Sequence, residues 1–436
     1  MVLGSGAVLL LASMVVTGAP GPCGGPLART SADEPRRERI TDREKGESTG
    51  KKIARFPLRV ATLPLWVLDR GLYHGMILVD EKKLIPRAVF VQRRLAELGI
   101  APQIGGAGDG AGFGGGVAWS FYRGPVRPTL SVSGSVKGYQ DHGFELDFSE
   151  IFDDKLDVVA GVRYRSRPQE DFFGLGPESR EQNRTSYNLE QTLASLDVEA
   201  AVAGAVTVAG QVELSNNNVS GGRDEAFPST ERVFSAAAVP GLGTGAELVT
   251  ADLSFVLDGR DYPGDATSGG LIQVFAGVGE DTGGAAFDYW HYGAEARGFL
   301  ALLGRGNRFG PRSVLALRVR GDFNQPRNGG TVPFFRMPHV GGSSSLRGFR
   351  EFRFYDRHAV VANFEYRWRI QALLEAVLFL DEGQVFDRIG DLELGSFRES
   401  YGGGIRVAFR HNTFFRVEIG RSSEDTRLLT KFNVGF

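Results

Sequence analysis

The sequence has very little cysteine, since Cys23 is the single thiol among 436 residues. An intramolecular disulfide needs two cysteines and a multi-cysteine metal site needs more, so both are excluded. Histidine is also scarce, and its six occurrences show no spacing typical of metal ligands. They are His74, His142, His291, His339, His358 and His411. We therefore predict a chain without a metal site or a cofactor.

Neither sign of charge is in excess, because 50 Lys and Arg residues face 52 Asp and Glu residues and the formal net charge is -2. Nothing in this balance indicates nucleic-acid binding. Beyond the N-terminal leader there is no apolar run of about 20 residues, which excludes a helical membrane protein. A β-barrel is not excluded, since its lipid-facing residues occupy only alternate positions. The abundance of Gly (60) and Phe (31) favours strands, tight turns and aromatic girdles.

Three segments that differ in composition and hydrophobic pattern precede the region rich in strand patterns. Residues 1–28 hold an apolar run followed by small residues, which is typical of a secretory signal peptide, although a basic start is missing and a disordered apolar N-terminus is the alternative. Residues 29–55 mix both charges without apolar periodicity, so we expect a disordered linker. Within residues 56–104, Pro86 as a first helical position and Gly99 as a cap predict a short periplasmic helix.

From Gly105 to Phe436 the dominant pattern has a period of two. The clearest run starts at Val360 and ends at Ile370, with an apolar residue at every second position and mostly charged or polar residues between them. A strand of a soluble β-sandwich can alternate in this way. A long strand with one apolar and one charged face, however, better fits a barrel wall between lipid and a polar lumen. About 330 residues at about 20 per strand and turn give roughly 16 strands. We predict an all-β fold, a transmembrane antiparallel β-barrel of about 16 strands over residues 105–436.

Two short motifs flank this strand. Residues 346–349 read Leu-Arg-Gly-Phe, and residues 379–383 read Phe-Leu-Asp-Glu-Gly. Together they resemble the conserved loop and the F-x-D-x-G strand of the BamA/TamA family, bacterial surface antigens that assemble outer-membrane proteins. In that family the loop folds into the barrel and its arginine pairs with the strand aspartate. The resemblance implies a loop-to-barrel lock formed by Arg347, Gly348, Phe349, Asp381 and Gly383.

Elementary electrostatics supports such a pair. A guanidinium inside a narrow lumen needs a carboxylate, and a bidentate pair also fixes the orientation of the loop that carries it. Glu365, on the polar face of the intervening strand, is a second candidate partner of Arg347. The alternative is an unrelated loop arginine and a lumen-facing Asp381 in an ordinary porin.

The C-terminal residues agree with the family resemblance, whereas the N-terminal residues depart from it. Val434 and the terminal Phe436 resemble the barrel assembly signal of outer-membrane proteins, although an ordinary last strand would show the same alternation. Full members of the family also carry periplasmic POTRA modules. Residues 29–104 lack the alternation of strands and helices that such a module requires, which is the main departure from the family pattern.

The sequence shows no arrangement of nucleophile, base and orienting group, so we expect that the protein is not an enzyme. Ser343 to Ser345, for example, do not form the G-x-S-x-G turn of a hydrolase. We predict a protein of the bacterial outer membrane that takes part in protein insertion or translocation. A non-catalytic channel or structural surface protein is the alternative. The expected partners are membrane lipid and lipopolysaccharide, and unfolded outer-membrane proteins or periplasmic assembly factors, without nucleic acid.

Overall fold

The computed structural model describes residues 94–104, 108, 110–121, 124–149, 155–303, 313–370, 374–409 and 412–432. The predictions of a signal peptide, a charged linker and a terminal assembly signal at Val434 and Phe436 lie outside these residues, as does most of the segment 56–104. The chain divides into two compact units, Met1–Leu98 and Gly99–Phe436. In the first unit, the described residues 94–97 are helical.

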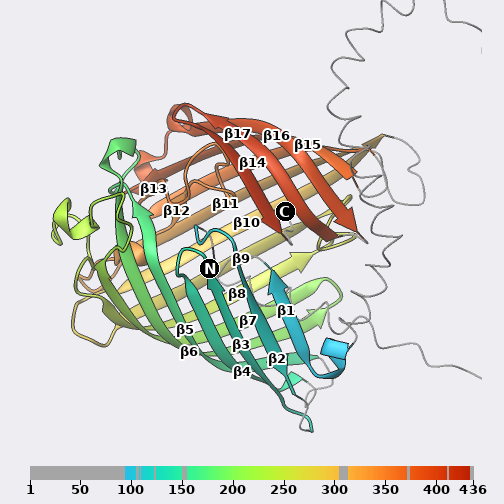
Figure 1. The fold of residues 1–436 in the computed structure, drawn as a ribbon, viewed down its shortest axis with the longest axis horizontal. Coiled ribbons are helices and arrows are strands. Elements are labelled where there is room, and N and C mark those ends of the chain that lie inside the picture. The colour runs from blue at the N-terminus through green and yellow to red at the C-terminus, as the bar shows by residue number, and fades with distance from the viewer. Residues whose placement is uncertain are drawn as a thin grey trace, which may run out of the picture. The chain divides into compact units, whose positions relative to one another are not determined.

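The second unit contains one antiparallel sheet of sixteen strands, in chain order except that β14 follows β11 directly. The strands of this sheet are β1 (Ile100–Ile104), β2 (Gly114–Ser120), β3 (Arg127–Ser135), β4 (Gln140–Asp147), β5 (Leu156–Phe172), β6 (Thr185–Ala203), β7 (Val206–Gly221), β8 (Ala246–Asp258), β9 (Gly269–Asp281), β10 (Tyr289–Leu303), β11 (Ser313–Pro326), β14 (His358–Arg369), β15 (Leu374–Phe386), β16 (Arg398–Phe409), β17 (Asn412–Ser422) and β18 (Thr426–Phe432). In Figure 1 the sheet curls, so that its first and last strands lie in front of β9 and β10.

The smaller elements all lie in the connections between these strands. Strands β12 (His339–Val340) and β13 (Phe354–Tyr355) form a separate two-stranded sheet between β11 and β14. The short 3-10 helices are η2 (Glu181–Asn183), η3 (Thr230–Arg232), η4 (Phe334–Arg336), η5 (Ile389–Asp391) and η6 (Leu394–Ser396).

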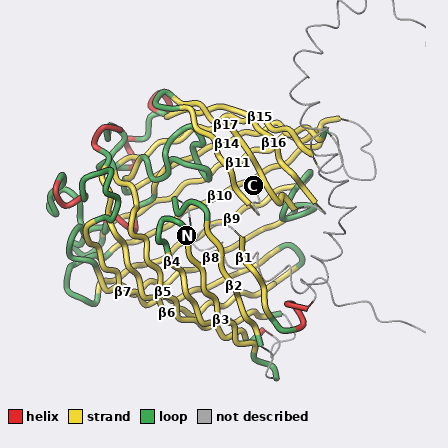
Figure 2. The backbone as a smooth tube through the Cα atoms, in the orientation of Figure 1, coloured by secondary structure: helices red, strands yellow, loops and turns green. Residues whose placement is uncertain are grey.

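Successive connections lie at opposite ends of the sheet, because consecutive strands are antiparallel, and the longest connections share one end. The long ones include residues 222–245, 327–357 and 387–397. At the other end, β6 and β7 are joined by residues 204–205, and β8 and β9 by residues 259–268. Figure 2 shows most of the loop tube, in green, gathered at one end of the sheet.

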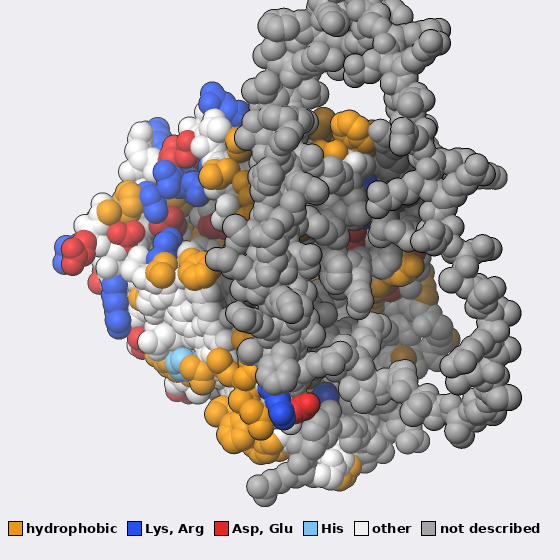
Figure 3. Space-filling model, turned by 45° about the vertical axis from the view of Figure 1, so that its right-hand side comes forward, with side chains coloured by type: hydrophobic (Ala, Val, Ile, Leu, Met, Phe, Trp, Pro, Cys, Tyr) orange, Lys and Arg blue, Asp and Glu red, His pale blue; other side chains and the backbone are white. Residues whose placement is uncertain are grey.

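The two faces of the sheet differ in chemistry, as β14 shows. Asn363, Glu365 and Arg367 are buried on one face, whereas Phe364 and Trp368 are exposed on the other. Successive side chains of a strand point to opposite faces, so the alternation in the sequence becomes a charged inner face and an apolar outer face. In the space-filling view, charged side chains gather at the left, where the loops lie, while hydrophobic side chains form patches over the strands (Figure 3).

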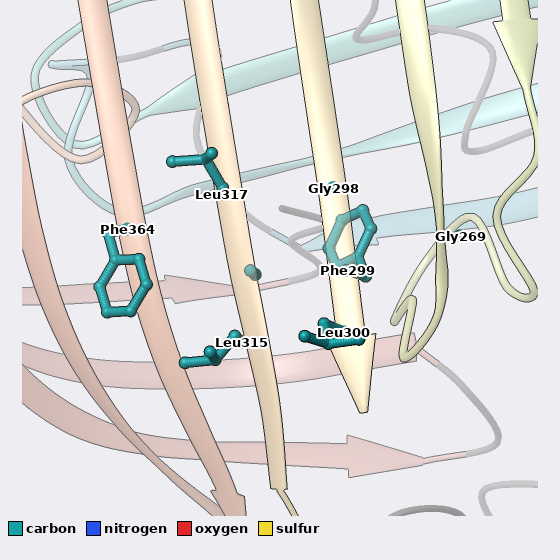
Figure 4. Close-up of a pocket in the computed structure, with 8 residues that line it drawn as sticks. Gly269, Gly298, Phe299, Leu300, Leu315, Leu317 and Phe364 are labelled. Carbon is teal, nitrogen blue, oxygen red and sulfur yellow. The ribbon is translucent and has the colours of Figure 1, made fainter. Parts of the chain in front are cut away.

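On the outer face, β10, β11 and β14 surround an apolar depression of about 410 Å³. It opens where Gly298 contributes no side chain, and Leu300, Leu317 and Phe364 project around it (Figure 4). The next residue along β10 from Gly298, Phe299, is buried. The same stretch of wall therefore presents apolar side chains to both sides.

Aromatic packing holds the loop 327–357 against the end of β5. The ring of Phe172 lies 5.3 Å from that of Phe334 and 5.6 Å from that of Tyr355, and all three residues are buried. Such pairs each contribute about 0.5–1.5 kcal/mol beyond the burial of their area. A second cluster includes Phe349 and Val385, one from the loop 327–357 and one from β15. The loop therefore packs against the inner face of the sheet.

The structure confirms the predicted all-β class, antiparallel pairing and sixteen strands. The sheet begins at Ile100, five residues before the predicted start at Gly105, and the glycine-rich stretch after Gly105 leads into β2. Closure into a barrel stays a prediction, because within the described residues β1 pairs only with β2 and β18 only with β17. No helix in the described part of the chain is long and apolar enough to cross a membrane.

Candidate functional site

Arg347, in the loop 327–357, is bound to Asp381 on β15 through three hydrogen bonds. Its backbone N–H donates to Asp381 Oδ2 at 3.1 Å, its Nε to the same oxygen at 2.9 Å, and its Nη2 to Oδ1 at 2.6 Å. Arg347 is 3% exposed and Asp381 is fully buried. The structure thus brings together the arginine and the aspartate of the two sequence motifs, in the bidentate geometry that fixes a guanidinium in orientation as well as position.

Glu365 on β14 is the second carboxylate at this guanidinium. Arg347 Nη1 donates to Glu365 Oε1 at 2.6 Å, while Arg367 Nε donates to Oε2 at 3.0 Å. Arg406, on β16, donates to both oxygens of Glu365 at 2.7 and 2.9 Å and to Glu418 Oε1 at 2.6 and 2.9 Å. Three arginines therefore meet on Glu365, which is fully buried. Burial of so many charges is tolerated only when each has partners close by.

Uncharged groups complete the surroundings of Asp381. Asn363 Nδ2 donates to Asp381 Oδ1 at 2.9 Å and to the carbonyl oxygen of Ser345 at 2.7 Å, so that it joins the loop to the carboxylate. Ser400 Oγ donates to Asp381 Oδ2 at 3.3 Å. The guanidinium of Arg347 lies 3.6 Å above the ring centroid of Phe379, a cation–π contact. The first aromatic residue of the strand motif thus supports the arginine of the loop motif.

The spacing of the strand motif explains why its residues act together. Phe379, Asp381 and Gly383 are two residues apart on one strand, so all three face the loop. A Cβ atom on Gly383 would lie 3.0 Å from Val340 Cγ1 and 3.4 Å from Leu346 Cδ2. The glycine therefore leaves the space that the loop occupies.

The loop residues Gly348 and Phe349 are fastened in different ways. Ser422 Oγ donates to the carbonyl oxygen of Gly348 at 2.9 Å, and a Cβ atom on Gly348 would lie 2.6 Å from the carbonyl carbon of Arg421. The ring of Phe349 lies 5.4 Å from that of Phe354, and both are buried. Backbone contact with β17 and apolar packing thus hold the residues that follow Arg347.

Replacement of Gly348 by alanine is expected to push the loop away from β17, because a Cβ atom this close to backbone atoms forces something to move. We expect Gly348→Ala to cost about 1–3 kcal/mol, the usual range for overpacking a closed site. Denaturant unfolding of the purified protein in detergent would measure the loss. Gly395→Ala is the control, since nothing lies within 4 Å of a Cβ atom there. Equal stability of the two variants would contradict the close packing of the loop.

Sequence reasoning did not find Asn363, Arg406 and Glu418 as members of this site. Their positions on the polar faces of β14, β16 and β17 were readable from the alternation, but many other charged residues share that property. Only the strand register and the path of the loop select these three. Val434 and Phe436 lie outside the described residues.

Comparison with known proteins gives a family and a fold. The sequence signature described as the Omp85 superfamily domain matches residues 110–413. The structure of BamA from Haemophilus ducreyi lacking POTRA domains 1–3 aligns with a TM-score of 0.56 and 15% identity, over 77% of this chain and 69% of that chain. CdiB from Escherichia coli aligns with a TM-score of 0.51 and 11% identity, over 78% of this chain and 63% of that chain. No curated protein sequence matches.

Proposed function

The chain belongs to the Omp85 superfamily, and on this basis we propose that it forms an outer-membrane β-barrel that inserts proteins into the membrane or moves them across it. The observation that carries the proposal is the loop 327–357, fastened by Arg347 to the charged inner face of a curled sixteen-stranded sheet. The role is not enzymatic. Its partners are membrane lipid and lipopolysaccharide, and unfolded outer-membrane proteins or periplasmic assembly factors.

The outer face supports a membrane location. Leu253, Leu378 and Leu428 expose 62%, 63% and 66% of their surface, each on a strand whose inner side is polar or charged. Apolar side chains exposed along so many strands would be unfavourable in water and are expected where lipid is the solvent. The charged inner face would then line a polar lumen.

The sheet edges supply a physical route to insertion. Within the described residues, β1 and β18 each pair with one neighbouring strand, so they are the two edge strands of the sheet. Such an edge can pair with an incoming strand of another protein. In the proposed mechanism a client strand adds to one of these edges, and the fastened loop keeps the neighbouring wall rigid while it does so.

Barrel formation has a direct test. In detergent, the purified protein is expected to run faster on a gel when it is not heated, because a closed barrel resists unfolding until heated, and its circular dichroism should be dominated by strand. Identical migration with and without heating, or a mainly helical spectrum, would end the barrel proposal.

The insertion activity has a separate test. Liposomes that contain the purified protein should accelerate the folding of a urea-denatured outer-membrane protein relative to empty liposomes, and depletion in the cell should reduce several outer-membrane proteins. If neither effect occurs while the heat-dependent gel shift is present, the alternative holds, namely a non-catalytic channel or structural surface protein. The absence of POTRA-like alternation in residues 29–104 is the sequence observation that favours this second candidate.

A further inference from the structure

The connection between β8 and β9, residues 259–268, does not extend away from the sheet but folds back onto its inner face. Ala266 is 3% exposed and packs in one cluster with Phe299, Val314 and Ala316. These three residues belong to β10 and β11 and lie on the inner side of the wall whose outer side is drawn in Figure 4. The turn therefore covers inner-face residues of the two strands beyond β9.

The tip of this turn reaches still farther, to β14. Asp265 is 5% exposed, and its Oδ2 accepts a hydrogen bond from Arg369 Nη2 at 3.0 Å. Its Oδ1 lies 3.7 Å from Arg367 Nη1. Because β10 and β11 separate β9 from β14 in the sheet, the turn has to cross the inner face to make these contacts.

The turn is built to hold this shape. Asp261 accepts hydrogen bonds from the backbone N–H groups of Tyr262, Thr267 and Ser268, and from the hydroxyl of Thr267 at 2.5 Å. Burial alone would raise the pKa of Asp261, but these hydrogen bonds hold it below its ordinary value. The carboxylate thus closes the turn on itself and presents Asp265 at its tip.

The charges at the turn are continuous with those at the loop. Arg367 Nε donates to Glu365 Oε2 at 3.0 Å, and Glu365 Oε1 accepts from Arg347 at 2.6 Å. Asp265, Arg367, Glu365, Arg347 and Asp381 therefore form one chain of alternating charge. It runs along the inner face from the β8–β9 turn to the loop 327–357, two segments that start from opposite ends of the sheet.

We infer that residues 259–268 form a plug, which restricts the passage of ions through the lumen at the end opposite the loop 327–357 and is held against β14 by Asp265. This inference rests on the proposed barrel. The plug and the loop 327–357 are both linked to Glu365, through Arg367 and Arg347, so release of one loosens the other.

The conductance of the purified full-length protein in planar lipid bilayers tests the closure. Asp265→Ala should raise the frequency of open-channel events at least about tenfold, because Arg367 and Arg369 lose the carboxylate that holds the turn. Asp157→Ala is the matched control, since this exposed aspartate lies on β5 at the same end of the sheet. Equal conductance of both variants would overturn the plug.

Thiol labelling locates the turn without reference to conductance. In a Cys23→Ser background, Ala266→Cys should react with a water-soluble maleimide at least about tenfold more slowly than Ser268→Cys, because residue 266 is buried and residue 268 is exposed. Adding Asp265→Ala should remove most of the difference. Equally fast labelling of both cysteines in the parent would overturn the inference.

The heat-dependent gel shift separates this inference from the proposed function. Variants that keep the shift but show neither the conductance change nor the labelling difference refute the plug and leave the barrel standing. A parent protein without the shift would refute the barrel, and the plug with it.

Discussion

Arg347→Ala is expected to lower the free energy of unfolding by about 3–5 kcal/mol, the range for removing one partner of a buried ion pair. The reason is the state in which Asp381 is left. That carboxylate is fully buried, and without the guanidinium it keeps only uncharged donors, namely Asn363, Ser400 and the backbone N–H of residue 347. A buried charge without a counter-charge is the costly outcome, more so than the loss of the hydrogen bonds themselves.

Asp381→Ala should cost less than Arg347→Ala, because Arg347 would still be bound to Glu365 at 2.6 Å. The double variant should be little worse than Arg347→Ala alone, since residues in one network are not additive. An exchange of charges, Arg347→Asp with Asp381→Arg, should recover little stability. An aspartate at position 347 would lie beside the carboxylate of Glu365, which in the parent protein binds the guanidinium of Arg347.

The midpoint of denaturant unfolding in detergent, with the temperature of the gel shift as a second readout, measures these effects. Arg388→Ala is the control, since Arg388 and Asp387 form an exposed pair at 3.9 Å, and such pairs contribute about 0–1 kcal/mol. Strictly additive losses for Arg347→Ala and Asp381→Ala would show that the two residues do not act as a unit.

Glu365→Gln is expected to destabilise the protein by a similar amount, about 3–5 kcal/mol, although it changes the shape of the side chain very little. Both carboxylate oxygens accept from arginines, four hydrogen bonds in all from Arg347, Arg367 and Arg406. A glutamine has one acceptor oxygen and turns an NH₂ group toward guanidinium groups that can only donate. Three cations would then share less negative charge in a closed space.

The same substitution should also loosen both segments that meet at Glu365. We expect Glu365→Gln to speed proteolysis within the loop 327–357. In the Ala266→Cys background, the same substitution should also speed maleimide labelling of residue 266. Glu399→Gln is the control, since this glutamate is exposed on β16. If Glu365→Gln unfolds at the same denaturant concentration as Glu399→Gln, the hydrogen bonds at Glu365 do not stabilise the fold.

Much of the fold was predictable because a strand has a fixed period of two. The alternation from Val360 to Ile370 predicted a strand with an apolar and a charged face, and β14 has both. The length of the region, about 330 residues at about 20 per strand and turn, predicted the number of strands. The start of the sheet was less predictable, since Ile100–Ile104 is a short strand that follows a helical pattern ending at Gly99, and short strands carry little periodic signal.

The sequence by itself therefore determined the strand class, the number of strands and which side chains share the inner face. It also supplied the two motifs that carry Arg347 and Asp381, through their resemblance to a known family. It could not say which inner-face charges meet, because that depends on strand register and on where the connections travel. Arg406 and Glu418 join the site from β16 and β17, and Asp265 crosses two strands to reach Arg367. Contacts between residues so far apart in the chain follow no local spacing, so only the tertiary structure decided them.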